Sequence, residues 1–160
     1  MRVMGKGFIM RYGCDEPGIY TIILFLEKGR RIGIGSLGTI DFAPGYYAYT
    51  GSARGPGGCK RVDRHVEILE GSRATRRWHI DYLLCKTGLV EVFITRTSRD
   101  LECSIAKAVG EHLSPVAGFG CSDCNCISHL YYGDDLERTR EAVSIAHSQA
   151  ASMALVPSRE

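Results

Sequence analysis

The chain has 160 residues, of which 44% are hydrophobic and 24% are charged, proportions typical of a globular protein with a sizeable core. Its apolar runs fall well short of the roughly 20 residues that cross a bilayer, which argues against a membrane protein. The net charge of +2 is too small by itself to indicate a polyanionic partner.

The N-terminal residues and the cysteines bear on the cellular compartment. Residues 1–12 are basic, but they lack the apolar core of a signal peptide. The chain has seven cysteines, an odd number that does not suit an extracellular disulfide framework. We therefore expect a cytoplasmic protein with reduced thiols or a metal site, although a heat-adapted source would also allow intracellular disulfides.

Strands dominate the first third of the sequence. Residues 19–26 are rich in β-branched and aromatic side chains and predict a first strand. Short strands are expected at 31–35 and 39–42, and another at 46–52, after a turn that contains Pro44 and Gly45. The short links between these segments favour antiparallel pairing.

Helices dominate the rest of the sequence. They are expected at residues 59–70, 77–85, 100–113 and 136–153, with strands at 90–95 and 129–132 and a loop rich in glycine and cysteine at 118–128. Strands followed by helices predict an α+β fold, a small and mainly antiparallel β-sheet flanked by helices. We expect a single domain over residues 1–160 that ends in a C-terminal helix.

The helix at 59–70 carries an arginine and a histidine on one face. Arg61, His65 and Ile68 recur at helical spacing. This face lies about 100° from the apolar stripe, so we expect Arg61 and His65 at the edge of the core. A guanidinium beside an imidazole suits a phosphate that is being cleaved; a surface arginine and a half-buried histidine is the simpler alternative. The apolar stripe consists of Val62, Val66 and Leu69.

Glu102 heads an apolar stripe on the helix at 100–113. The same face carries Ala106, Val109 and Leu113, so the carboxylate is expected to point inward or along a cleft. A bound Mg²⁺ or Mn²⁺ would offset the cost of burying it. A salt bridge to an arginine, or stabilisation in the first turn of the helix, is an equally good explanation.

Two tyrosines lie in strands that are expected to be neighbours. Tyr20 opens the first strand and Tyr49 lies in the strand at 46–52. Both phenols could reach the same end of the sheet, where a metal or Arg61 would lower the phenol pKa and help to activate a water. Packing is the ordinary alternative, because tyrosines are common in strands.

Basic residues cluster between positions 54 and 77, around a glycine-rich turn at 55–58 that precedes a helix. Backbone N–H groups at such a turn favour anions, and a basic patch fits a phosphate backbone; a solvated helix face and a plain turn are the alternatives. The residues expected to contact nucleic acid are Ser52, Arg54, Gly57, Gly58, Lys60, Arg64, Arg76 and Arg77.

The ordered set of motifs resembles the GIY-YIG nuclease superfamily. Its first motif stands as Gly18-Ile19-Tyr20, its second as Tyr49-Thr50-Gly51, and its helical motif as Arg61 to His65, with Glu102 in the place of the metal-binding glutamate. The likeness spans residues 18–132. It is closest to small proteins of the Uri-type endonuclease group, on segments that include 51–55, 78–83 and 118–124.

This resemblance implies a metal-dependent endonuclease that hydrolyses phosphodiester bonds, with DNA expected over RNA. Tyr20 would act as general base or orient the attacking water, and Tyr49 would support it. Arg61 would stabilise the pentavalent phosphate, and His65 would assist proton transfer. Glu102 would hold one Mg²⁺ or Mn²⁺. The family likeness also implies that residues 31–42 form an added β-hairpin.

Two further groups of residues are candidates. His79 and Asp81 either join the site or brace the core, and bracing is the preferred interpretation. Four residues with the spacing C-x2-C-x-C-x2-H are candidate zinc ligands, although Cys14, Cys59 or Cys103 could complete such a site, and a compact loop of thiols or disulfides is the alternative. The four residues are Cys121, Cys124, Cys126 and His129.

Two other functions remain compatible with the sequence. A nucleic-acid-binding module without catalysis would keep the basic patch and use the tyrosines for stacking or packing. A zinc-stabilised interaction domain would be built around the cysteine loop. Cleavage that depends on a divalent cation separates the endonuclease from both.

Overall fold

A computed structural model describes residues 16–55, 57, 58, 60–122 and 124–155. The sequence-based interpretations of residues 1–12, Cys14 and Cys59 concern positions outside this part of the chain. In the part that is described, no helix is both long and apolar enough to cross a membrane.

The main sheet has five strands in the order β5-β1-β4-β7-β6, and every neighbouring pair is antiparallel. β1 (Gly18–Leu26) lies between β4 (Gly45–Ser52) and β5 (Gly88–Arg96), and β7 (Leu130–Gly133) lies between β4 and the short β6 (Ser114–Pro115). The antiparallel sheet flanked by helices confirms the expected α+β fold.

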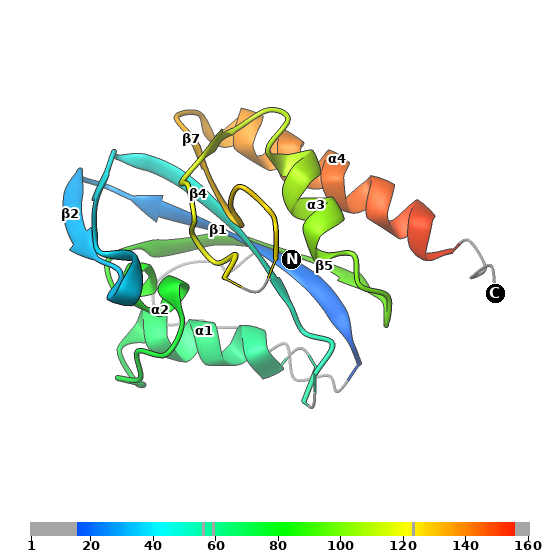
Figure 1. The fold of residues 1–160 in the computed structure, drawn as a ribbon, viewed down its shortest axis with the longest axis horizontal. Coiled ribbons are helices and arrows are strands. Elements are labelled where there is room, and N and C mark those ends of the chain that lie inside the picture. Colours follow the sequence, from blue (N-terminus) through cyan, green and yellow to red (C-terminus); the bar gives the residue numbers. More distant parts are fainter. Residues whose placement is uncertain (1–15, 56, 59, 123, 156–160) are drawn as a thin grey trace.

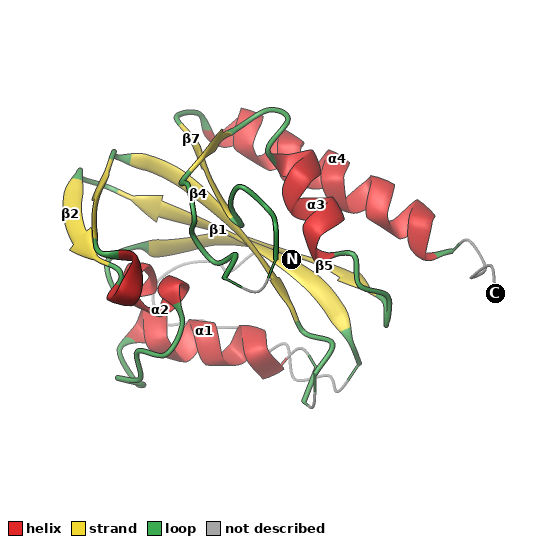
Figure 2. Ribbon diagram, in the orientation of Figure 1, coloured by secondary structure: helices red, strands yellow, loops and turns green. Residues whose placement is uncertain are grey.

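Helices cover both faces of this sheet (Figure 1). α1 (Lys60–Glu70) and α2 (His79–Leu84) lie on one face, and α3 (Glu102–Val109) and the C-terminal α4 (Leu136–Ala154) lie on the other. Figure 2 shows the same arrangement with the helices in red and the strands in yellow. The core is therefore two apolar layers separated by the sheet.

β1 is buried on both faces, and its side chains alternate between the two layers. Tyr20 and Ile22 pack in the layer of α1 and α2, whereas Ile19 and Ile23 pack in the layer of α3 and α4. In the β1–β4 ladder Tyr20 pairs with Gly51, and Ile22 pairs with Tyr49. The two tyrosines are thus diagonal neighbours on the α1–α2 face.

A buried polar network ties α4 to the other face of the sheet. Nε2 of His147 lies 2.8 Å from Oγ1 of Thr21, and Nδ1 lies 2.9 Å from Oγ1 of Thr95. The Thr21 hydroxyl also lies 2.8 Å from that of Thr50. These contacts satisfy polar groups that would be costly to bury alone.

The segment after β1 leaves the main sheet. β2 (Arg30–Gly33) and β3 (Thr39–Phe42) pair only with each other among the described strands, and the single 3-10 turn η1 (Gly35–Leu37) joins them. This is the added hairpin expected at residues 31–42. It packs beside α2.

α2 (His79–Leu84) is shorter than the helix predicted at 77–85, and two other helices differ in more consequential ways. In α1 His65 and Ile68 are buried with Val62 and Val66, whereas Leu69 is only partly buried. The core side of α1 therefore includes the face expected at the edge of the core. α3 ends at Val109 instead of residue 113, and the chain turns at Gly110, where a β-carbon would collide with the ring of Tyr131.

Candidate functional site

A cavity of about 330 Å³ opens beside the ends of β1 and β4. Four of the five residues proposed for catalysis line it: Tyr20, Tyr49, Arg61 and Glu102. They come from β1, β4, α1 and α3, so the cavity joins both helical layers. The other residues of its wall are Gly35, Ser36, Gly51, Ser52, Arg77, Trp78, His79, Tyr82, Gly120 and Ser122.

The fifth residue, His65, lies behind Tyr20. The Tyr20 hydroxyl and Nε2 of His65 are 2.6 Å apart, and both side chains are buried. Burial lowers the pKa of His65 to about 3, with nearby Arg64 and Arg61 lowering it further against the opposite effect of Asp81. Burial also raises the phenol pKa of Tyr20 well above its ordinary value, so both members of this pair are neutral at physiological pH.

Tyr49 completes the buried aromatic side of the cavity. Its ring meets those of His65 and Phe119 edge-on, with ring centroids 6.2 Å apart in both cases. Burial raises the phenol pKa of Tyr49 above its ordinary value. Tyr49 is therefore a neutral hydroxyl at the cavity wall.

Gly51 makes the position of Tyr20 possible. The two residues face each other across the β1–β4 ladder, and a β-carbon at Gly51 would collide with the hydroxyl and ring of Tyr20. Because the Tyr20 hydroxyl is held by His65, the ring cannot move aside without losing that contact. Gly51, in the second motif, thus has to be a glycine in this fold because a larger residue would displace the Tyr20 ring.

Arg61 is fixed on two sides. Its Nη1 donates to the backbone carbonyl of Ser52 at 2.7 Å, and its guanidinium carbon lies 4.7 Å from the ring centroid of Trp78. Arg64 and Arg77 lie over the same indole at 4.2 and 5.7 Å. Trp78 therefore gathers three cationic side chains at or near the cavity.

Asp81 holds the residues around Trp78 in place through hydrogen bonds. Its fully buried carboxylate accepts two hydrogen bonds from Arg64, at 3.1 Å each, and two more from the backbone N–H groups of Arg77 and Trp78. Burial alone would raise the pKa of Asp81, but these donors hold it below the ordinary range. Asp81 is outside the cavity wall and positions the residues around it.

His79 differs from Asp81 because it lines the cavity. Its Nδ1 accepts a hydrogen bond from the backbone N–H of Gly120 at 3.0 Å. Since an accepting nitrogen carries no proton, the ring proton is on Nε2, which makes His79 a donor. His79 thus braces the 118–128 loop and is also part of the cavity wall.

Glu102 occupies the boundary between the cavity and the cysteine loop. Its side chain is 25% exposed, and Oε1 lies 3.5 Å from Nδ1 of His129. Among the described residues it is the single carboxylate in the cavity wall. A carboxylate is a hard oxygen donor of the kind that could hold a divalent cation such as Mg²⁺.

The other residues proposed for nucleic-acid contact have varied surroundings. Ser52 and Arg77 line the cavity, and Arg64 is held by Asp81. Arg54 pairs with Asp100 at 3.5 Å and is not among the residues that line the cavity. Gly57, Gly58 and Lys60 form the turn that leads into α1, and Arg76 lies in a neighbouring groove.

This groove, of about 530 Å³, runs between the β2–β3 hairpin and α2. It carries four basic side chains, and Tyr82 contributes to both the groove and the cavity. Sequence reasoning missed most of it because the hairpin residues become neighbours of α2 only through tertiary folding. The basic side chains are Arg30, Arg31, Arg76 and Lys86.

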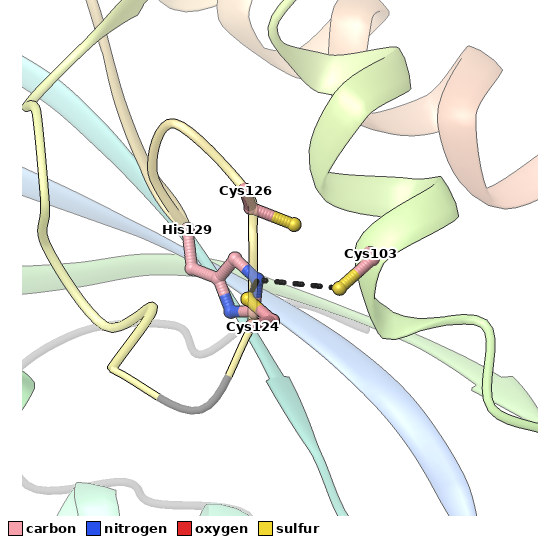
Figure 3. A group of neighbouring side chains, drawn as sticks. All are labelled: Cys103, Cys124, Cys126 and His129. Atoms are coloured by element: carbon pink, nitrogen blue, oxygen red, sulfur yellow. Dashed lines mark hydrogen bonds between the residues drawn. The ribbon is translucent and has the colours of Figure 1, made fainter.

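The cysteine loop forms a compact cluster, but its composition differs from the sequence prediction. The ligand atoms of Cys103, Cys124, Cys126 and His129 all lie within 4.8 Å of one another (Figure 3). Cys121 is outside this group, and its Sγ contacts the carbonyl of Ile127 at 3.7 Å. Cys103 of α3 replaces it, because the first turn of that helix packs against the loop.

Comparisons with known proteins place the chain in a family. A family model described as a domain of unknown function, DUF123, matches residues 19–152. No curated protein matches the chain, and no solved structure does. The matched segment contains every residue of the cavity and of the cysteine cluster. The chain belongs to the DUF123 family.

Proposed function

We propose that this protein is a metal-dependent endonuclease that hydrolyses phosphodiester bonds, with DNA as its substrate. The observation that carries the proposal is the meeting of Tyr20, Tyr49, Arg61 and Glu102 in one cavity, with His65 hydrogen-bonded behind Tyr20. These are the positions at which the sequence resembles the GIY-YIG nucleases.

Tyr20 orients the attacking water in this proposal. The Tyr20 phenol keeps its proton because burial raises its pKa, and the imidazole of His65 is a weak base because burial lowers its pKa, so neither is a ready base in the free protein. If the Tyr20 hydroxyl donates inward to Nε2 of His65, the phenol lone pairs face the cavity and accept a hydrogen bond from water. His65 therefore acts as a positioning residue that aims the phenol.

Arg61 and His79 bind the phosphate. One donor of Arg61 is engaged with Ser52, and the guanidinium has further donors to offer to phosphoryl oxygens. The Nε2–H of His79 is a second donor in the cavity wall. Together they stabilise the negative charge that develops on the pentavalent phosphate.

Glu102 would hold the divalent cation. When bound, Mg²⁺ or Mn²⁺ supplies positive charge that favours ionisation of a nearby water and stabilises the oxygen that leaves. The carboxylate of Glu102 is held in the wall by its contact with His129, which fixes the place from which it binds.

The surrounding charge suits a polyanion that is longer than one phosphate. The groove with Arg30, Arg31, Arg76 and Lys86 adjoins the cavity at Tyr82, so neighbouring phosphates of a bound strand meet basic side chains. Trp78 lines the same cavity, together with Arg61 and Arg77, which lie over its ring. A strand passing through the groove would place one phosphate in the cavity.

The test is a cleavage assay with the full chain. Labelled single-stranded, duplex and branched DNA and matching RNA are incubated with Mg²⁺, Mn²⁺ or a chelator. We expect internal cuts with a metal and none with the chelator. Arg61→Ala is expected to abolish cutting, whereas Arg138→Ala, at an exposed position of α4, is the matched control and is expected to cut normally.

Other results would redirect the assignment. Nucleic-acid binding that Arg61→Ala weakens, without cleavage under any metal condition, would replace the endonuclease with a non-catalytic binding module. Cleavage of RNA alone would keep the chemistry and change the substrate.

A further inference from the structure

The cluster of Cys103, Cys124, Cys126 and His129 stands apart from the proposed chemistry. It meets Glu102 through His129, and none of its four residues lines the cavity wall. Figure 3 shows the three sulfur atoms and the imidazole directed toward a common centre. We propose that these four residues bind one structural zinc ion, which fastens the 118–128 loop to α3.

The distances in the cluster suit tetrahedral coordination. Nε2 of His129 lies 3.4 Å from Sγ of Cys124 and 3.9 Å from Sγ of Cys103. A tetrahedral zinc ion with Zn–S bonds of about 2.3 Å and a Zn–N bond of about 2.0 Å holds its ligand atoms roughly 3.5–3.8 Å apart. Shifts well below 1 Å would bring these contacts to that spacing. Three thiolates and an imidazole are also a typical ligand set for structural zinc.

His129 is prepared to act as a ligand. Its Nδ1 faces the carboxylate of Glu102 at 3.5 Å, and its Nε2 faces the sulfurs. A carboxylate on one ring nitrogen keeps the proton there and leaves the other nitrogen to the metal, the usual arrangement around zinc-bound histidines. The imidazole is 2% exposed, so its orientation is fixed by packing.

Zinc would organise the wall of the cavity. The loop between β6 and β7 contains no helix or strand among its described residues. It nevertheless supplies Gly120 and Ser122 to the cavity wall. It also supplies the buried Phe119 to the core, where the Phe119 ring meets that of Tyr49. One ion held by the loop and by α3 would fix this wall and the adjacent Glu102 together.

The proposal does not depend on the endonuclease assignment, because its test is metal content. The full chain, produced without a polyhistidine tag, is dialysed and analysed for metals. We expect one zinc ion per chain. Cys103→Ser and Cys124→Ser are expected to reduce the zinc content to a small fraction, whereas Cys85→Ser, an exposed cysteine at the end of α2, retains it.

Cys121→Ser separates the observed cluster from the set suggested by the sequence, and we expect this variant to keep its zinc. Should the Cys103 or Cys124 variants fail to fold, replacement of zinc by Co²⁺ in the unmodified chain gives a second measurement. Intense visible absorption with thiolate-to-cobalt charge transfer indicates a tetrahedral thiolate site.

Three results would overturn the proposal: unmodified protein without zinc that also gives no tetrahedral cobalt spectrum, full zinc content in Cys103→Ser, or a disulfide within the cluster in protein isolated under non-reducing conditions.

Discussion

Tyr20 and Gly51 face each other across the β1–β4 ladder so closely that the glycine has no room for a β-carbon. The ring of Tyr20 occupies that room, and His65 holds its hydroxyl from the other side. The tyrosine of the first motif is therefore placed by the glycine of the second and by the histidine of α1.

Gly51→Ala is expected to displace the Tyr20 ring. The overpacking is expected to cost about 1–3 kcal/mol of unfolding free energy, measured by urea denaturation, and to lower cleavage together with stability. Gly88→Ala is the matched control, because Gly88 lies in β5 with open space at its β-position. Equal effects of the two substitutions would contradict the steric argument.

Tyr20→Phe is expected to reduce cleavage about 10²- to 10⁴-fold, since it removes the hydroxyl that orients the water in the proposed mechanism. Substrate binding is expected to change little, which a fluorescence anisotropy titration would show. Tyr47→Phe is the control, because the Tyr47 hydroxyl donates to the carbonyl of Ala43 and lies outside the cavity wall. A similar loss of activity in both variants would make the effect structural.

His79→Asn separates the two contacts of His79. The asparagine oxygen takes the place of Nδ1 and still accepts from the N–H of Gly120, whereas the donor at Nε2 is lost. We expect a melting temperature close to that of the unmodified protein and a clearly lower kcat. Retention of full kcat would mean that His79 only braces the loop.

Glu102→Gln is expected to affect two metals differently. Cleavage in Mg²⁺ or Mn²⁺ is expected to be lost, because the proposed cation site would lose its carboxylate ligand. Zinc is expected to remain bound, but with an affinity about 10- to 100-fold weaker in chelator competition, because His129 loses its carboxylate partner. Glu111→Gln, in the exposed turn after α3, is expected to change neither property.

Stability is expected to fall as the pH drops below about 6.5, partly because of His147. Burial lowers its pKa from 6.5 to about 4 in the folded protein, so the folded state binds fewer protons than the unfolded state. Above pH 6.5 the free energy of unfolding keeps the full contribution of the neutral His147. As the pH falls from 6.5 toward 4, the free energy of unfolding decreases by about 1.4 kcal/mol per pH unit. Urea denaturation of unmodified protein and His147→Gln at several pH values measures this share. Parallel pH profiles would contradict it.

Much of the sheet could be predicted from the sequence. The β-branched and aromatic run of β1 and the glycines at turns indicated strands and antiparallel links, and β3 (Thr39–Phe42) has its expected bounds. Which face of α1 is buried could not be predicted from the hydrophobic pattern. His65 is polar, yet it lies in the core because Tyr20 satisfies one of its nitrogens.

Contacts between distant segments account for what the sequence did not reveal. Cys103 was one of three possible additions to a zinc site, and nothing in its local spacing set it apart from Cys14 or Cys59. Trp78 gave no signal as a partner of three arginines, since stacking across helices leaves no periodic pattern. Trp78 meets its arginines only when α1 packs beside the start of α2, and Cys103 meets its partners only when α3 packs against the 118–128 loop.

The interior position of β1, between β5 and β4, has a consequence for the register of its pairing. Its two sides have incompatible chemistry: Tyr20 belongs beside His65, and the next residue, Thr21, belongs beside His147. A slip of one position would bring a threonine into the cavity and a phenol into the polar network. Misaligned pairing of this strand would thus be unfavourable on both faces of the sheet at once. The buried contacts on the two faces therefore select a single register for β1.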